Sequence, residues 1–156
     1  MITKEYIKMC EANEEIQKVW IPKAGDYVQL KKNRQIYLIS SVEKSKDKKK
    51  VVFYTNIING NDSWCYIEFF KDNFIWLPTL EQLFEIWSYL CNTNNKAHPN
   101  YLAGDHLPTQ FFYRIHKELT RTNIGIWFDK AVCLEIIMRD FYKKVWTGEK
   151  WEKVTR

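Results

Sequence analysis

Glycine is scarce in this sequence, and its five glycines stand far apart along 156 residues. A glycine-rich loop of the kind that holds phosphates in nucleotide-binding enzymes is therefore excluded. Long apolar runs are also missing, because no stretch approaches the about 20 consecutive apolar residues that a membrane span requires. The first residues turn acidic and helical at once, without the basic and then apolar segments of a secretion signal. We therefore expect a cytoplasmic protein that does not cross a membrane.

Cysteine is sparse as well. The chain has four cysteines, each alone in a segment that looks apolar: Cys10, Cys65, Cys91 and Cys133. No pair has the close spacing of a zinc site or of a redox motif. We interpret all four as reduced side chains that fill the core.

The groups that usually carry catalysis do not form a recognisable arrangement. His98, Asp105 and His106 fall in one loop, but their spacing matches no common pattern of metal ligands. His116 stands alone on a predicted helix, where a surface or boundary position is the ordinary one. The sequence also lacks a nucleophile elbow. We therefore predict a protein that is not an enzyme and that uses neither a metal nor a cofactor.

The first half of the chain predicts a helix followed by a sheet. Apolar residues at gaps of three and four favour one helix over residues 4–20, with Thr3 as its cap. Strand-like runs rich in β-branched and aromatic residues follow at 27–30, 36–42, 51–57 and 64–70. The connections are too short for helical crossovers, so antiparallel pairing is expected, with a short segment at 74–77 after the last strand.

The second half predicts mainly helices. Thr79 and Gln82 form a capping-box pair at the start of a helix, and the polar stretch 92–106 is expected to be an irregular loop. Two further helices are expected, over 107–121 and from an Asp129 cap to about residue 144. Thr147 and Gly148 between two tryptophans indicate a small terminal hairpin.

These patterns together predict an α+β fold. We expect an antiparallel sheet of four to five strands packed against three to four helices. No repeat, low-complexity tract or linker divides the chain, so residues 1–156 are predicted to form a single domain.

One segment carries the positive charge. The net charge is +5, and residues 31–50 alone hold eight Lys or Arg against two acids. A cluster of lysines would lie at the tip of a hairpin between two predicted strands: Lys44, Lys46, Lys48, Lys49 and Lys50. This tip either contacts phosphates or an acidic partner, or is a solvated turn whose charges protect a sheet end from aggregation.

Aromatic residues make up 16% of the chain, including seven tryptophans. Flat rings can stack on a base or line a protein interface, although a small sheet also needs large side chains to fill its core. The candidate ligand contacts among the rings are Trp64, Tyr66, Trp76 and Trp127. Arg114 and Arg121, seven residues apart on a predicted helix, would share one face and either neutralise phosphates beside the rings or simply face solvent.

Three short blocks resemble a family of small, largely uncharacterised proteins from phages and prophages of Gram-positive bacteria. The blocks are Trp-x-Pro-Lys-x-Gly-Asp at residues 20–26, Trp-Leu-Pro-x-x-x-Gln-Leu at 76–83 and Trp-x-Gly-x-x-Trp at 146–151. The resemblance implies phage origin and a location in the cytoplasm of the bacterial host. It brings no activity and no catalytic residue.

Our leading hypothesis is a non-catalytic phage accessory protein that counters host immunity. It would sequester a small nucleotide signal or block a host defence protein through an aromatic and basic surface. The alternative is a nucleic-acid-binding protein that uses the lysine-rich hairpin. A homo-oligomer is compatible with either function, since pockets often form between subunits, although no residue pattern requires one.

Overall fold

A computed structural model describes residues 2–44, 46, 49–93, 115 and 129–154. Its contacts group the chain into two compact units, which are described separately. The helical unit comprises Met1–Met9 and Thr79–Arg156, and the sheet unit comprises Cys10–Pro78. Helices and antiparallel sheets are both present, which confirms the predicted α+β class.

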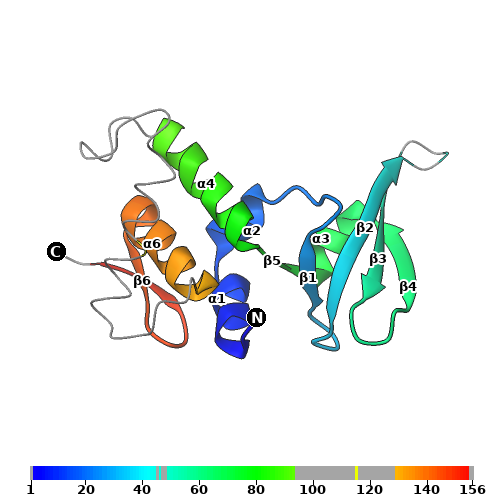
Figure 1. Cartoon of the computed structure of the whole chain (residues 1–156), viewed down its shortest axis with the longest axis horizontal. Coiled ribbons are helices and arrows are strands. Elements are labelled where there is room, and N and C mark those ends of the chain that lie inside the picture. The colour runs from blue at the N-terminus through cyan, green and yellow to red at the C-terminus, as the bar shows by residue number, and fades with distance from the viewer. Residues whose placement is uncertain (1, 45, 47–48, 94–114, 116–128, 155–156) are drawn as a thin grey trace. The chain divides into compact units, whose positions relative to one another are not determined.

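The sheet unit is built on five antiparallel strands. They are β1 (Tyr27–Leu30), β2 (Ile36–Lys44), β3 (Lys50–Asn56), β4 (Asp62–Tyr66) and β5 (Phe74–Leu77), in the order β4-β3-β2-β1-β5 (Figure 1). The first four strands form a meander, and β5 returns to pair with β1. The first three predicted strands and the expected antiparallel pairing are confirmed, and the short segment at 74–77 is a strand.

The predicted strand over 64–70 is wrong in its second half. The chain leaves the sheet after Tyr66 and forms α3 (Ile67–Asn73). The reason lies in packing, because Phe70 is fully buried and its ring stacks on that of Phe74 at 4.0 Å between centroids. In a continued strand Phe70 would share the face of the exposed Trp64 and Tyr66, whereas the turn into α3 places its ring in the core.

The predicted helix over 4–20 is also wrong in one respect, because it is interrupted. The structure has α1 (Lys4–Glu11) and α2 (Glu14–Val19), with Asn13 buried between them. Asn13 Oδ1 accepts a hydrogen bond from the Ile16 amide at 3.1 Å, so its side chain caps α2. Asparagine side chains compete with helical backbone bonds in this way and favour caps over helix interiors. The expected Thr3 cap is confirmed, since Thr3 Oγ1 accepts from the Tyr6 amide.

A buried carboxylate organises the core of the sheet unit. Asp26 is fully buried, and its Oδ2 accepts from Trp20 Nε1 at 2.8 Å and from the Lys23 amide at 3.0 Å. Gly25 precedes it with φ +90°, a conformation that favours glycine. The Trp20 ring held in this way stacks on Trp76 of β5, with centroids 5.9 Å apart and planes at 7°.

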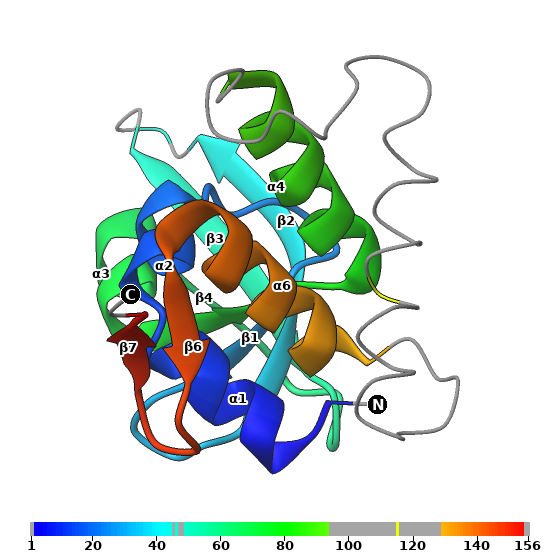
Figure 2. The same cartoon turned by 90° about the vertical axis from the view of Figure 1, so that its left-hand side faces the viewer.

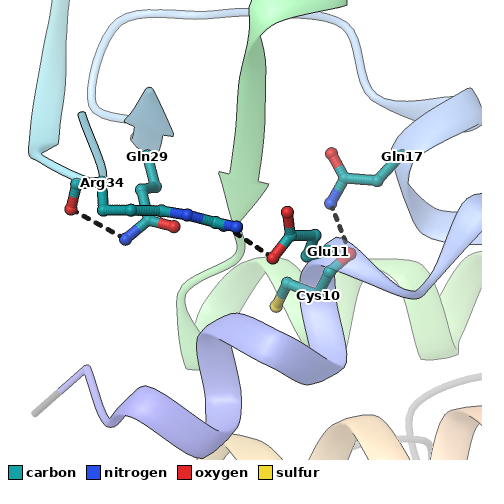
Figure 3. Close-up of polar contacts among 5 residues, drawn as sticks. All are labelled: Cys10, Glu11, Gln17, Gln29 and Arg34. Atoms are coloured by element: carbon teal, nitrogen blue, oxygen red, sulfur yellow. Dashed lines mark hydrogen bonds and ion pairs between the residues drawn. The ribbon is translucent and has the colours of Figure 1, made fainter. Parts of the chain in front are cut away.

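Side-chain amides and one ion pair complete the sheet unit. Gln17 accepts from the Trp76 amide at 2.9 Å and donates to the Trp76 carbonyl at 3.0 Å, so it occupies the outer edge of β5 as a strand would. Gln17 also donates to the Cys10 carbonyl, and Arg34 pairs with Glu11 at 2.7 Å (Figure 3). Gln29 donates to the carbonyl of Arg34, which has φ +59°. Of these contacts, those of Gln17 satisfy the outward backbone groups of β5 at Trp76.

The helical unit packs α4 (Leu80–Thr93) against α6 (Lys130–Tyr142), followed by the hairpin of β6 (Lys144–Trp146) and β7 (Trp151–Lys153) (Figure 2). The capping box is confirmed, because the Thr79 amide donates to Gln82 Oε1 and the Gln82 amide donates to Thr79 Oγ1. The Asp129 cap is confirmed by its bond from the Ala131 amide. The terminal hairpin is confirmed as well.

Two predicted segments lie mostly outside the described residues. They are the loop over 92–106, of which only the first two residues are described, and the helix over 107–121, of which only Ile115 is described. Ile115 is helical and fully buried. The prediction of a single domain stays a prediction.

Replacing Asp26 by alanine removes the acceptor that Trp20 Nε1 and the Lys23 amide share. We expect Asp26→Ala to lower the free energy of unfolding by roughly 3–6 kcal/mol, because two hydrogen bonds to a charged group are lost and each contributes about 1.5–3 kcal/mol. Urea unfolding followed by tryptophan fluorescence measures the change. The control Lys32→Ala, at an exposed turn position, should change stability by less than about 0.5 kcal/mol. Equal stability of Asp26→Ala and the wild type would contradict the role given to this carboxylate.

Candidate functional site

The hairpin of β3 and β4 presents aromatic side chains on one face. Trp64 and Tyr66 are two residues apart on β4 and therefore point to the same side of the sheet, with 60% and 39% of their surface exposed. Their cross-strand partners on β3 are Phe53 and Val51. We call the side formed by Val51, Phe53, Trp64 and Tyr66 the outer face. The opposite, inner face carries Tyr54 toward Phe70 and Phe74 in the core.

The rings of the outer face are arranged with a cation beside them. The Trp64 and Tyr66 centroids lie 6.1 Å apart with their planes at 89°, so the two rings meet edge to face. Lys49 Nζ lies 5.2 Å from the centroid of the Tyr66 ring, a cation–π contact. One face of Tyr66 is therefore occupied by an ammonium group, while the more exposed Trp64 ring offers its surface to solvent.

Further lysines extend the positive charge from Lys49 to the β2–β3 tip. Lys44, Lys46 and Lys50 are all exposed. Lys44 and Lys50 lie directly opposite each other in the β2–β3 ladder, an arrangement of like charges that destabilises a hairpin. An anion bound at the tip would relieve this repulsion. Lys48 lies outside the described residues.

The other end of the outer face is acidic. Asp62 begins β4 opposite Thr55, whose hydroxyl donates to the carboxylate at 2.5 Å. Along β4 the outer face thus runs from a carboxylate through Trp64 and Tyr66 to Lys49. Charge of opposite sign stands at its two ends.

The structure brings together part of the predicted site. Trp64 and Tyr66 adjoin the lysine-rich tip, as an aromatic and basic surface requires. Trp76 does not belong to this surface, because it is only 6% exposed and stacks on Trp20 in the core. That prediction is corrected: the ring fills the interior and offers no face to a ligand. Arg114, Arg121 and Trp127 lie outside the described residues.

Sequence reasoning did not single out Phe53 or Asp62. Phe53 is half-buried beside Trp64, and Asp62 closes the acidic end of the outer face. The two-residue spacing of Asp62, Trp64 and Tyr66 already placed these three on one face. Phe53 joins them only through the register of β3 against β4.

A small groove lies elsewhere in the sheet unit, between α2 and β5. Its volume is about 210 Å³, and its polar lining comes from Glu11, Glu14, Gln17, Lys31 and Lys71. Glu11 pairs with Arg34, Glu14 pairs with Lys18, and Lys31 donates to the Asp72 carbonyl. Because most of these groups already have partners within the chain, the groove has no evident preference for an anion or a cation.

Metal binding and membrane insertion find no support in the described part of the chain. Within it, no group of three or more His, Cys, Asp or Glu is placed to hold a metal ion. None of its helices is both long enough and apolar enough to cross a bilayer. None of the four cysteines, all of which are described, forms a disulfide; Cys10 and Cys133 are buried as expected of core residues, whereas Cys65 and Cys91 are only half-buried.

Comparisons with models of protein families, with curated protein sequences and with solved structures give no match. The resemblance to the phage family therefore stays a prediction.

The inner face of the same hairpin carries a titratable phenol. Burial, reinforced by the neighbouring Cys65 thiol, raises the pKa of Tyr54 to about 12. Burial likewise raises the pKa of the Cys65 thiol. The folded state thus retains the Tyr54 proton at a pH where an unfolded chain, with a phenol pKa of about 10, loses it.

The free energy of unfolding should therefore fall as the pH rises from about 10 to about 12, because the unfolded state releases its proton first. Tyr54→Phe should remove this part of the pH dependence, whereas Tyr89→Phe, at an exposed position of α4, should not. Urea unfolding at a series of pH values measures the difference between variants. An identical pH profile for Tyr54→Phe and the wild type would contradict the assignment.

Proposed function

We propose that the outer face of the β3–β4 hairpin, together with the lysines of the β2–β3 tip, binds single-stranded nucleic acid. The observation that carries this proposal is the exposed Trp64 ring beside an ammonium group, that of Lys49, held over Tyr66. A base can stack on Trp64 while a neighbouring phosphate meets Lys49 and the tip.

The chemistry of the surface favours an unpaired strand over a duplex. A stacking ring needs a base whose flat face is accessible, and base pairs stacked within a duplex do not offer one. A duplex could still reach the lysines through its phosphates, but it would gain nothing from Trp64. We therefore expect single strands to bind more tightly than duplexes of equal length.

The shape of the surface favours a strand over a single nucleotide. Sites for small molecules bury about 70–90% of the ligand in a cleft. The outer face instead presents the exposed rings of Trp64 and Tyr66 along β4, and the groove described above lies beside β5. Sequestration of a small nucleotide signal is thus the less favoured form of the hypothesis.

The wider role remains a proposal based on the resemblance to phage proteins. A phage protein that covers single-stranded nucleic acid in the host cytoplasm could shield it from defence enzymes. The same basic surface could instead meet an acidic patch on a defence protein. No bond-making step belongs to either version.

Fluorescence anisotropy with a labelled 20-nucleotide oligothymidylate tests the proposal directly. We expect binding at low salt, with at least a tenfold preference over a duplex of the same length. Equal binding of the two, or none, would overturn the proposal. Calorimetric titration with cyclic and linear adenine nucleotides tests whether the protein sequesters a nucleotide signal. Binding heat with these nucleotides and none with oligothymidylate would favour that hypothesis.

Trp64→Ala removes the stacking ring and should raise the dissociation constant about 5- to 150-fold, because stacking on one base contributes about 1–3 kcal/mol. The matched control is Tyr89→Ala, which deletes a ring of similar exposure on α4. Anisotropy titrations of both variants make the comparison. A Trp64→Ala protein that binds like the wild type would exclude stacking at this position.

Replacing Lys44, Lys46, Lys49 and Lys50 by serine removes the phosphate contacts. We expect the slope of log affinity against log salt to become shallower by roughly 2–3, since each contact to a single strand contributes about 0.7. A control removes the same charge from other exposed positions: Lys8, Lys18, Lys71 and Lys153. Titrations at several salt concentrations measure the slope. If the control variant loses as much slope as the tip variant, the tip has no special role.

A further inference from the structure

The outer edge of β4 is open for pairing. β4 is the outermost strand of its sheet (Figure 1). The Asn56 amide donates to the Asn61 carbonyl, and the antiparallel ladder then alternates, so bonded pairs recur at Tyr54 with Ser63 and at Val52 with Cys65. The amides of Asp62, Trp64 and Tyr66 therefore point away from β3. Among the described residues, none accepts a hydrogen bond from these amides.

The two edges of the sheet differ. At β5 the Gln17 side chain satisfies the outward groups of Trp76. β4 is protected less, since its residues Asp62–Tyr66 include no proline and no lysine and pair without a bulge. Of the described strands in this sheet, β4 is thus the one whose outer edge can pair with another strand.

We propose that a second copy of this chain pairs with β4 in antiparallel orientation, with the two-fold axis at Trp64. The backbone amide of each Trp64 then donates to the backbone carbonyl of the other. Each Tyr66 amide donates to the Asp62 carbonyl of the second copy. Ser63 lies opposite Cys65 of the second copy. The outer faces of both copies join on one side of a continuous sheet.

Charge selects this register. Lys49, held over Tyr66, comes next to Asp62 of the second copy, and the contact occurs twice by symmetry. Moving the axis by two residues along β4, to Asp62 or to Tyr66, brings like charges together, the two Asp62 carboxylates or the two Lys49 ammonium groups. Moving it by one residue keeps both outer faces on one side but sets Trp64 opposite Asp62 or Tyr66 of the second copy, so that Lys49 no longer comes next to Asp62.

Pairing would complete the ligand surface, a consequence that rests on the proposed function. One protomer offers one exposed ring, that of Trp64, and the Asp62 carboxylate at the end of its outer face would repel a phosphate. In the pair the Trp64 residues are neighbours, with Cα atoms about 5.5 Å apart. Each Asp62 carboxylate meets a lysine, and a basic tip stands at both ends. One strand of nucleic acid can then cross two rings.

Sedimentation velocity of the full chain over a range of concentrations tests the pairing. A five-residue edge buries little area, so we expect a weak, reversible dimer whose fraction rises with concentration. Asp62→Lys and Lys49→Asp should each weaken association at least tenfold. The double variant, which exchanges the charges, should recover most of it. Lys46→Asp at the tip is the control and should leave association unchanged.

A monomer at all concentrations, or a double variant no better than the single ones, would overturn the proposal. Ser63→Cys supplies an independent test, because a non-bonded antiparallel pair brings Cα atoms to about 4.5 Å, within the range of a disulfide. Mild oxidation should link position 63 of one copy to Cys65 of the other, as identified by peptide mass spectrometry. Ser40→Cys, exposed on β2, should not form such a link, and a Ser63→Cys protein that stays unlinked would contradict the register.

These outcomes separate the pairing from the proposed function. If the protein dimerises but binds no oligonucleotide, the proposed pairing stands and the proposed function is wrong. If the Asp62→Lys protein is monomeric but binds oligothymidylate as tightly as the wild type, the proposed function stands and the proposed surface shared by two copies is wrong.

Discussion

The sheet unit depends on one buried contact, the hydrogen bond from the Trp20 indole to the Asp26 carboxylate. This bond orients a large ring that stacks on Trp76, and so it joins the end of α2, the turn before β1 and the strand β5. A carboxylate without water is costly unless it is well bonded, and Asp26 accepts from Trp20 and Lys23. The position of the first and last strands therefore follows from this contact.

The aromatic core in turn decides what the outer face can be. Phe70, Phe74 and Tyr54 fill the inner side of the sheet next to Trp20. Because side chains alternate along a strand, once Cys65 faces inward, Trp64 and Tyr66 must face out. The exposed parts of the Trp64 and Tyr66 rings bury no apolar surface and so add nothing to stability by burial. Their place beside Lys49 is the observation on which the proposed binding of a base near a phosphate rests.

The three sequence blocks that carry the predicted resemblance to phage proteins have structural explanations. Trp20 and Asp26 of the first block meet Trp76 of the second, and Gln82 of the second block caps α4. In the third block Trp146 and Trp151 pack together, and Trp151 donates to the Met9 carbonyl. These residues specify a fold and leave the β3–β4 surface undefined. A resemblance carried by them therefore says more about architecture than about a ligand.

The sequence by itself determined the elements whose signals are local. The caps at Thr3, Thr79 and Asp129 and the periodicity of the first strands depend on neighbours within a few residues, and these predictions are confirmed. It also placed Trp64 and Tyr66 on one side of a strand near a basic tip. Only the tertiary structure decided that Trp76 is buried, that Asn13 breaks the first helix and that Phe70 ends the fourth strand. The burial of Trp76 depends on Trp20, which is distant along the chain and whose meeting with Trp76 no local pattern encodes. The Asn13 cap and the Phe70–Phe74 stack act within four residues, but the longer helix and strand patterns that overlap them predicted a different structure. Which rings reach solvent is therefore a property of the packed core, and the candidate surface could be assigned only once that core was known.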